Sequence, residues 1–197
     1  MRKKAKVYPV FKVDFLKIAI HYRFVTKTIC YSINPNKYFE AVLFIFKQQK
    51  CKNVIYITTN KPYDSLVHLF DINGINTKNF FFIDCISLQL GRRMEDEPNN
   101  CLFLESPENL CKLSVTTKEL IKHFRGEKLV FLDSLSTLRV YNDPEVLAKF
   151  ISNFMLNKVN GLHVDSVILA LESDVDLETK ELVEKFADEV KKYGNQL

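Results

Sequence analysis

Continuous apolar runs, each separated from the next by a segment of helical periodicity, are the feature that most constrains the fold of this chain. Short runs of β-branched and aromatic residues are typical of strands that are buried on both faces of a sheet. Strands alternating with helices predict an α/β fold, a three-layer α/β/α sandwich with a mainly parallel sheet. We expect strands at 27–33, 53–59, 80–86, 101–106, 128–134 and 166–173, and helices at 38–50, 63–72, 114–124, 143–159 and 176–190.

Local signals set the expected ends of some of these elements. A capping box that begins at Ser114 predicts the start of the helix at 114–124. Residues 88–100 are charged, contain Gly and Pro, and predict one long loop. The last helix, 176–190, can break near Ala187 into a short final strand.

The 197 residues suit one domain that is preceded by a basic segment. We expect residues 1–26 to form a basic N-terminal helical arm and residues 27–197 to form a single α/β domain. Residues 1–27 hold eight Lys and Arg against one acid, whereas the rest of the chain holds 20 basic and 23 acidic residues. This asymmetry leaves open a solvated arm that pairs with the acidic body, a contact with nucleic acid through residues 1–27, and a helix on a membrane surface.

The five cysteines indicate reduced thiols rather than a metal site. None forms a CxxC pair, no His lies at zinc-ligand spacing from such a pair, and Cys30, Cys85 and Cys101 fall inside apolar strand-like runs. The apolar stretch near the N-terminus is too interrupted for a signal peptide, and no run reaches the roughly 20 residues of a membrane span. We therefore expect a cytoplasmic protein without a membrane span.

The first candidate site is the segment "YSINPNKY" at 31–38, between an expected strand and an expected helix. A phosphate loop of the form Gly-x-x-x-x-Gly-Lys-Ser/Thr turns backbone N–H groups inward, neutralises phosphate with its Lys and holds Mg²⁺ with its hydroxyl. When Lys37 is placed on the motif lysine, Tyr31 and Asn36 occupy the glycine positions and Tyr38 occupies the hydroxyl position. Only the lysine is retained, so the segment alone indicates a strand–helix turn with an exposed Lys.

The second candidate is Asp133, which follows the apolar run "LVFL" at the end of an expected strand. This is the Walker B pattern, in which the Asp holds the Mg²⁺ shell. Ligands of an open parallel sheet bind beyond the carboxyl ends of its strands, where Asp133 and the turn at 31–38 are both expected.

The runs "VIYITTNKP", "FFIDCIS", "LVFLDSLSTL", "NDPEVLAKFISNF" and "SVILALES" together resemble the core of the RecA/KaiC-like P-loop ATPases. The resemblance covers roughly residues 27–190, looks closest to small archaeal KaiC-like proteins, and includes a degenerate Walker A loop. It implies a RecA-like domain at 27–197, in which Asp133 holds Mg²⁺ if the ion is retained. The vestigial nucleotide site that it implies comprises Asn34, Asn36, Lys37, Asn60, Asp133 and Ser134.

The resemblance also implies that no catalytic residue is left. RecA/KaiC-like ATPases usually carry a Glu after the second strand as the general base. This chain has Thr59, Asn60 and Lys61 there, and the amide of Asn60 cannot take a proton. No cofactor is therefore expected, although binding of ATP with Mg²⁺ stays open.

Two functional hypotheses follow. The leading one is a non-catalytic RecA/KaiC-like domain that acts as a regulatory or protein-interaction module, with a protein partner or self-association and with nucleotide binding weak or lost. The alternative is an ATP-binding protein or slow ATPase with a remodelled phosphate loop, in which Lys37, Asp133 and the hydroxyls of Ser134, Ser136 and Thr137 hold phosphate and an ion.

A third cluster comprises Glu172, Asp174, Asp176 and Glu178, which follow the last long apolar run. Carboxylates of this density bind hard cations, but they are also favoured in a solvated loop before a helix N-terminus. The second interpretation needs no ligand.

Overall fold

The residues that the computed structural model describes are 26–48, 52–156, 164–172 and 176–194, without the side chains of 154–156. The helical arm expected at 1–26 lies outside this part of the chain, apart from its last residue.

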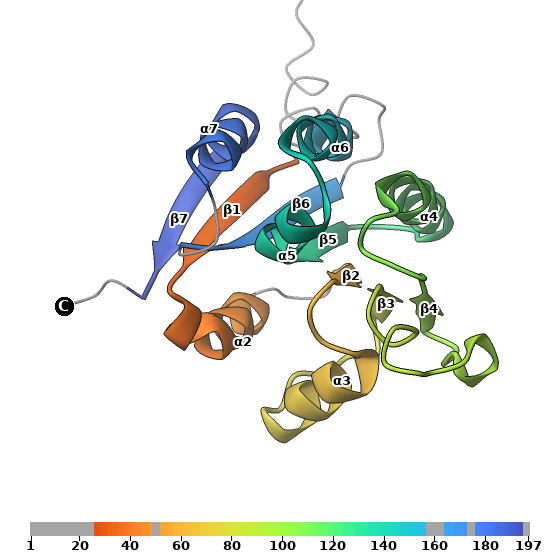
Figure 1. Cartoon of the computed structure of the whole chain (residues 1–197). Helices are drawn as coiled ribbons and strands as arrows, with labels where there is room; N and C mark the ends of the chain where they lie inside the picture. The colour runs from red at the N-terminus through yellow and green to blue at the C-terminus, as the bar shows by residue number, and fades with distance from the viewer. Residues whose placement is uncertain (1–25, 49–51, 157–163, 173–175, 195–197) are drawn as a thin grey trace, which may run out of the picture.

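One parallel sheet of seven strands organises the described residues, in the order β4-β3-β2-β5-β6-β1-β7 (Figure 1). Every neighbouring pair runs parallel, which confirms the expected sheet. The strands are β1 (Thr28–Ile33), β2 (Asn53–Thr58), β3 (Phe80–Asp84), β4 (Cys101–Phe103), β5 (Lys128–Asp133), β6 (Val164–Leu171) and β7 (Glu189–Tyr193).

Helices cover both faces of this sheet, so the three-layer α/β/α fold is confirmed. α2 and α3 lie on one face, and α4, α5, α6 and α7 lie on the other (Figure 1). No helix in the described ranges is both long and apolar enough to cross a membrane. The helices are α2 (Tyr38–Gln48), α3 (Tyr63–Ile72), α4 (Leu110–His123), α5 (Leu135–Tyr141), α6 (Pro144–Leu156) and α7 (Leu177–Phe186), with 3₁₀ turns η1 (Pro35–Lys37) and η2 (Met94–Asp96).

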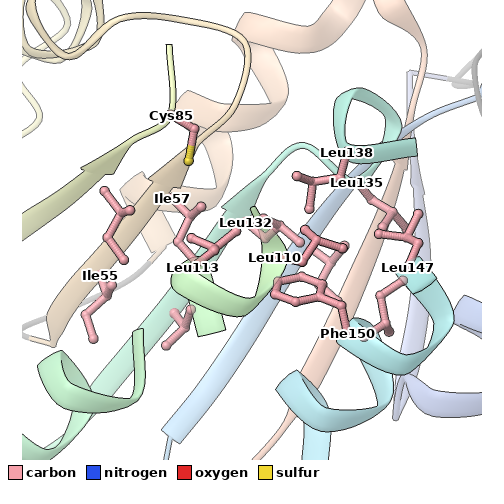
Figure 2. Packing of buried hydrophobic residues seen from close by; sticks show 14 of the residues in the cluster. Ile55, Ile57, Cys85, Leu110, Leu113, Leu132, Leu135, Leu138, Leu147 and Phe150 are labelled. Carbon is pink, nitrogen blue, oxygen red and sulfur yellow. The ribbon is translucent and has the colours of Figure 1, made fainter. Parts of the chain in front are cut away.

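Two hydrophobic cores, one on each face, explain why the strands are apolar without alternation. Successive side chains of a strand point to opposite faces, so Ile55 and Ile57 enter the core under α4, α5 and α6, while Val54 and Tyr56 enter the core under α2 and α3. Figure 2 shows the first of these cores, where Leu147 of α6 packs beside leucines of α5.

The second core is mainly aromatic. The ring of Phe131 in β5 lies 4.6 Å from that of Phe46 in α2 and 4.9 Å from that of Tyr56 in β2, measured between centroids. Phe70 of α3 and Phe82 of β3 extend the cluster from Tyr56, and both are fully buried. This cluster joins the inner face of α2 to the centre of the sheet.

Two sequence-based expectations need correction. α4 begins at Leu110 rather than at Ser114, because Asn109 caps it by accepting from the backbone N–H of Lys112 at 2.9 Å. The segment after β5 forms the separate helix α5, with Ser134 as its N-cap. Two others are confirmed: residues 88–100 form the expected loop, which contains the short turn η2, and the strand expected after Ala187 is β7.

We expect Phe131→Ala to destabilise the domain by about 3–5 kcal/mol, because it removes a fully buried ring from the aromatic core. Chemical denaturation measures this change. Phe44→Ala is the matched control, since Phe44 is 42% exposed, and its cost should be about 1 kcal/mol or less. Equal costs for the two variants would contradict this description of the core.

Candidate functional site

The candidate site lies where β2 and β5 end side by side. From β2 the chain crosses one face through α3 to β3, and from β5 it crosses the other face through α5 and α6 to β6 (Figure 1). Neighbouring strands whose connections diverge in this way form a topological switch point, the usual ligand site of open α/β sheets. Thr58 pairs with Asp133 in the register of β2 and β5, so Thr59, Asn60 and Ser134 follow at this point.

The Asp133 carboxylate is buried here and is held by three side-chain donors. The Tyr56 hydroxyl donates to Oδ2 at 2.5 Å, and the Tyr38 hydroxyl donates to the same oxygen. Asn60 Nδ2 donates to Oδ1 at 3.2 Å. Asp133 and Tyr56 are fully buried, Tyr38 is 9% exposed and Asn60 is half-buried. We call these four side chains the Asp133 cluster.

Burial governs ionisation in the Asp133 cluster. Removal from water raises the pKa of Asp133, and the donated hydrogen bonds from Tyr38, Tyr56 and Asn60 offset only part of that rise. The pKa values of Tyr38 and Tyr56 are raised well above the ordinary tyrosine value, first by burial and then by the charge of Asp133. Both tyrosine hydroxyls therefore stay protonated and donate hydrogen bonds to Asp133.

Backbone contacts lock the ends of the two strands together. Thr59 donates its N–H to the carbonyl of Asp133 at 2.7 Å, and its hydroxyl accepts from the Ser134 N–H at 3.0 Å. The peptide bond between Asp133 and Ser134 is cis. The Ser134 hydroxyl accepts from the N–H of Thr137 and caps α5, so it already has a structural role.

The backbone N–H groups of the turn at 34–37 are all engaged by acceptors of the chain itself. Asn34 N–H donates to the Tyr193 carbonyl at 3.2 Å, Asn36 N–H to Asn34 Oδ1 at 3.0 Å, and Lys37 N–H to the Asn34 carbonyl at 2.8 Å. Tyr38 N–H donates to the Pro35 carbonyl, and Pro35 itself has no N–H. A phosphate loop needs inward N–H groups that are free to bind an anion, and this turn leaves none from Asn34 to Tyr38.

Lys37 does not join the Asp133 cluster. Its ammonium pairs with Glu40 at 2.9 Å on the exposed side of α2, and this hydrogen bond raises the pKa of Lys37. The six residues expected to form a nucleotide site therefore fall into two groups. Asn60 and Asp133 are bonded to each other with Ser134 next to them, whereas Asn34, Asn36 and Lys37 make a separate, self-contained turn.

Sequence reasoning missed both tyrosines of the cluster and the neighbouring lysine. Tyr38 occupies the position of the Mg²⁺-binding hydroxyl in the motif, and Tyr56 stands in an otherwise aliphatic strand next to the Asp133 strand; these are the signals that could have found them. Lys61 Nζ lies 4.7 Å from the ring centroid of Phe39 and 5.9 Å from that of Tyr38. Its charge lowers the pKa of Asp133, although less than burial raises it.

A second buried carboxylate, Asp84 at the end of β3, has a structural role. It accepts from the N–H groups of Tyr63 at 2.6 Å, Ile86 at 2.7 Å and Ser87 at 2.8 Å, and from the Ser87 hydroxyl at 2.6 Å. These donors fix the turn after β3 and the start of α3.

In the acidic cluster before α7, the described residue Asp176 acts as a helix N-cap rather than as a cation ligand. Asp176 caps α7 by accepting from Thr179 N–H at 2.7 Å, and it pairs with Arg139 of α5 at 2.6 Å. Asp174 lies outside the described residues. Within the described ranges no group of three or more His, Cys, Asp or Glu side chains could hold a metal ion.

The cysteines expected to lie in strands are buried free thiols. Burial raises the pKa of the Cys30 thiol to about 12, and it also raises the pKa values of Cys85 and Cys101. None of these three is therefore a thiolate nucleophile near neutral pH.

Comparison with known proteins found no match: no protein-family model and no curated protein is similar to this chain.

We expect Tyr56→Phe to destabilise the domain by about 1.5–3 kcal/mol near pH 8, because it removes a donor to a buried carboxylate. The loss should be smaller near pH 4, where protonation of Asp133 weakens the need for donors. Chemical denaturation at both pH values tests this. Tyr63→Phe is the control, since the Tyr63 hydroxyl donates to the neutral Asn100 side chain at 2.8 Å and its loss should cost the same at both pH values.

The raised pKa of Asp133 also predicts how stability depends on pH. Between the ordinary aspartate value of about 3.9 and the raised value, the folded state binds more protons than the unfolded state, so this group's contribution to stability falls as pH rises. Asp133→Asn lacks this titration. The stability of the wild type relative to Asp133→Asn, from denaturation at a series of pH values, should therefore decline as pH rises through this window. A relative stability that grows with pH would mean a lowered pKa and would contradict this prediction.

Proposed function

We propose that this chain is a non-catalytic RecA/KaiC-like domain that acts as a regulatory or protein-interaction module, with nucleotide binding weak or lost. The observation that carries the proposal is that protein donors already occupy both oxygens of the buried Asp133 carboxylate. Its two oxygens accept from Tyr38, Tyr56 and Asn60, and the carboxylate is fully buried. A Mg²⁺ ion on Asp133 would have to compete with at least one of these donors, Asn60 at Oδ1 or the tyrosines at Oδ2.

The residues around the cluster support the absence of hydrolysis. A general base must reach the attacking water, and the side chain after β2 that could do so is Asn60, whose Nδ2 is committed to Asp133. The self-bonded turn at 34–37 offers no N–H cradle for phosphate, and Lys37 pairs with Glu40. The turn therefore offers no groups to bind the phosphates of a nucleotide or to stabilise the charge that develops during their hydrolysis.

Exposed apolar side chains support the interaction role. Val140 of α5 is 78% exposed and Leu177 of α7 is 71% exposed. The residues that precede them, Arg139 and Asp176, form an ion pair, which brings the two positions close together. Val146 of α6 adds a further exposed side chain close in sequence to α5. Exposed apolar side chains that lie close together favour contact with a protein.

Two further parts of the proposal rest on the sequence. The buried thiols of Cys30, Cys85 and Cys101 support a reducing, cytoplasmic location. Nucleic-acid binding through residues 1–27 stays a prediction, because all but the last two of these residues lie outside the described part of the chain.

A thermal-shift titration tests the proposal. A ligand that binds the folded state raises Tm by mass action, so we expect ATP and ADP, with and without Mg²⁺, to leave Tm unchanged for the wild type. Lys37→Ala should give the same result, and Lys47→Ala in α2, the helix that follows Lys37, is the matched control for loss of a surface charge.

A rise in Tm that requires Mg²⁺ and disappears in Lys37→Ala, but not in Lys47→Ala, would contradict the proposal. It would favour an ATP-binding protein or slow ATPase with a remodelled loop.

A further inference from the structure

The two edges of the sheet are treated differently. At the β4 edge, Cys101 donates its N–H to the Pro98 carbonyl at 3.0 Å, and Phe103 donates its N–H to the Glu97 side chain. The loop before β4 therefore satisfies the outward donors of that strand, which is a common protection of edge strands.

The β7 edge has no such cover among the described residues. β7 is the outermost strand and pairs with β1 on one side only (Figure 1). Asp188 donates its N–H to the Thr28 carbonyl at 2.9 Å, so alternate residues from Asp188 onward face β1 in this parallel ladder. Glu189 and Lys191 therefore turn their backbone N–H and C=O groups outward, where no described residue bonds them.

The charges along this edge are complementary to themselves. The five residues from Asp188 to Lys192 read acid, acid, valine, base, base. When a second copy runs antiparallel with Val190 opposite Val190, Glu189 lies opposite Lys191 of the second copy, and Asp188 lies opposite Lys192. The first of these pairs lies on the α2 face of the sheet and the second on the α7 face, because successive side chains of a strand alternate.

The backbone favours the same register. Opposite residues of an antiparallel ladder alternate between hydrogen-bonded and non-hydrogen-bonded pairs. With Val190 on a two-fold axis, Glu189 and Lys191 form the hydrogen-bonded pairs, and these are the residues whose backbone groups point outward. Val190 forms the non-hydrogen-bonded pair, which suits a residue whose own backbone faces β1.

Neighbouring symmetric registers bring like charges together. An axis at Lys191 would place two lysines opposite each other, and an axis at Glu189 would place two glutamates opposite each other, which is destabilising. A lysine on an edge strand often prevents pairing with another chain. Here the position opposite Lys191 is taken by Glu189 in the register centred on Val190, so the lysine selects that register instead.

Pairs within the chain leave this selection in place. Glu189 pairs with Lys27 and, at 3.6 Å, with Lys191 of its own strand. The side chains of Glu189 and Lys191 are 36% and 42% exposed, so each can also meet a group of the second copy. Exposed pairs of this kind contribute little affinity. The backbone hydrogen bonds hold the strands, and the charges decide their register.

We propose that two copies of this chain associate through β7, which pairs antiparallel with β7 of the second copy around a two-fold axis at Val190. The two sheets then form one continuous sheet. The inference rests on the proposed function and identifies the protein partner as a second copy. The same patch is used by both copies, as in most symmetric dimers.

Sedimentation of the full chain over a dilution series tests the assembly. We expect the average mass to rise from that of one chain toward twice that value. Glu189→Lys and Lys191→Glu each place like charges opposite each other and should weaken self-association at least about tenfold. An equal mixture of these two variants should associate again, because each altered position then faces a charge of opposite sign.

A cross-link tests the register without relying on charge. In a Cys111→Ser background, which removes an exposed thiol, Val190→Cys should form a disulfide between copies under mild oxidation. Cα atoms of a non-hydrogen-bonded pair lie about 4.5 Å apart, within the range that a disulfide spans. Lys192→Cys should not cross-link, because the two copies of this position lie about 13 Å apart along the strands. The Cys111→Ser chain is oxidised in parallel.

Matched controls separate this interface from a general effect of charge. Lys122→Glu on α4 also loses a pair with a glutamate, Glu119, but lies away from β7, and it should associate like the wild type (Figure 1). Unchanged Tm values for the Glu189 and Lys191 variants show that the fold is intact.

Several outcomes would overturn the proposal. One is a chain that stays monomeric at every concentration, and another is association that neither charge reversal weakens, which would place the interface elsewhere. A mixture that stays monomeric, or equal cross-linking through Lys192→Cys and Val190→Cys, would exclude the register. None of these outcomes changes the thermal-shift result with ATP, so they are distinct from failure of the proposed function.

Discussion

The buried carboxylate of Asp133 is the constraint on which the rest of the site depends. A carboxylate without water is costly unless donors surround it, and here the donors come from three separate segments. Tyr38 belongs to α2, Tyr56 to β2, and Asn60 to the turn after β2. The cluster therefore ties the start of α2 to the centre of the sheet, and it does so at the switch point where a ligand would otherwise enter.

The turn before α2 leads directly into this tie. Tyr38 bonds to Asp133 directly after the short turn η1, whose N–H groups bond within the chain. Lys37 then lies beside β7, where its ammonium group pairs with Glu40 instead of facing the switch point. The cation that acts on Asp133 is Lys61, whose charge lowers the pKa of that carboxylate.

The fold was largely predictable from the sequence, whereas the site was not. Strands such as β2 and β5 are apolar on both faces, which only a parallel sheet between two helical layers satisfies, and this pattern is visible in the residues. The predicted start of α4 was wrong because the capping signal at Ser114 was chosen over Asn109, which caps the helix one turn earlier. The Asp133 cluster could not be predicted because Tyr38 and Tyr56 meet Asp133 from 95 and 77 positions away, a proximity that depends on strand order.

NMR of the full chain with carboxyl-labelled aspartate tests the central claim most directly, since it observes Asp133 and the hydroxyl protons of Tyr38 and Tyr56. We expect slowly exchanging hydroxyl protons, and an Asp133 carboxyl resonance that does not move when Mg²⁺ and ATP are added together. A shift of that resonance with loss of the two hydroxyl protons would contradict the account, because it would mean that the ion and nucleotide displace the tyrosines.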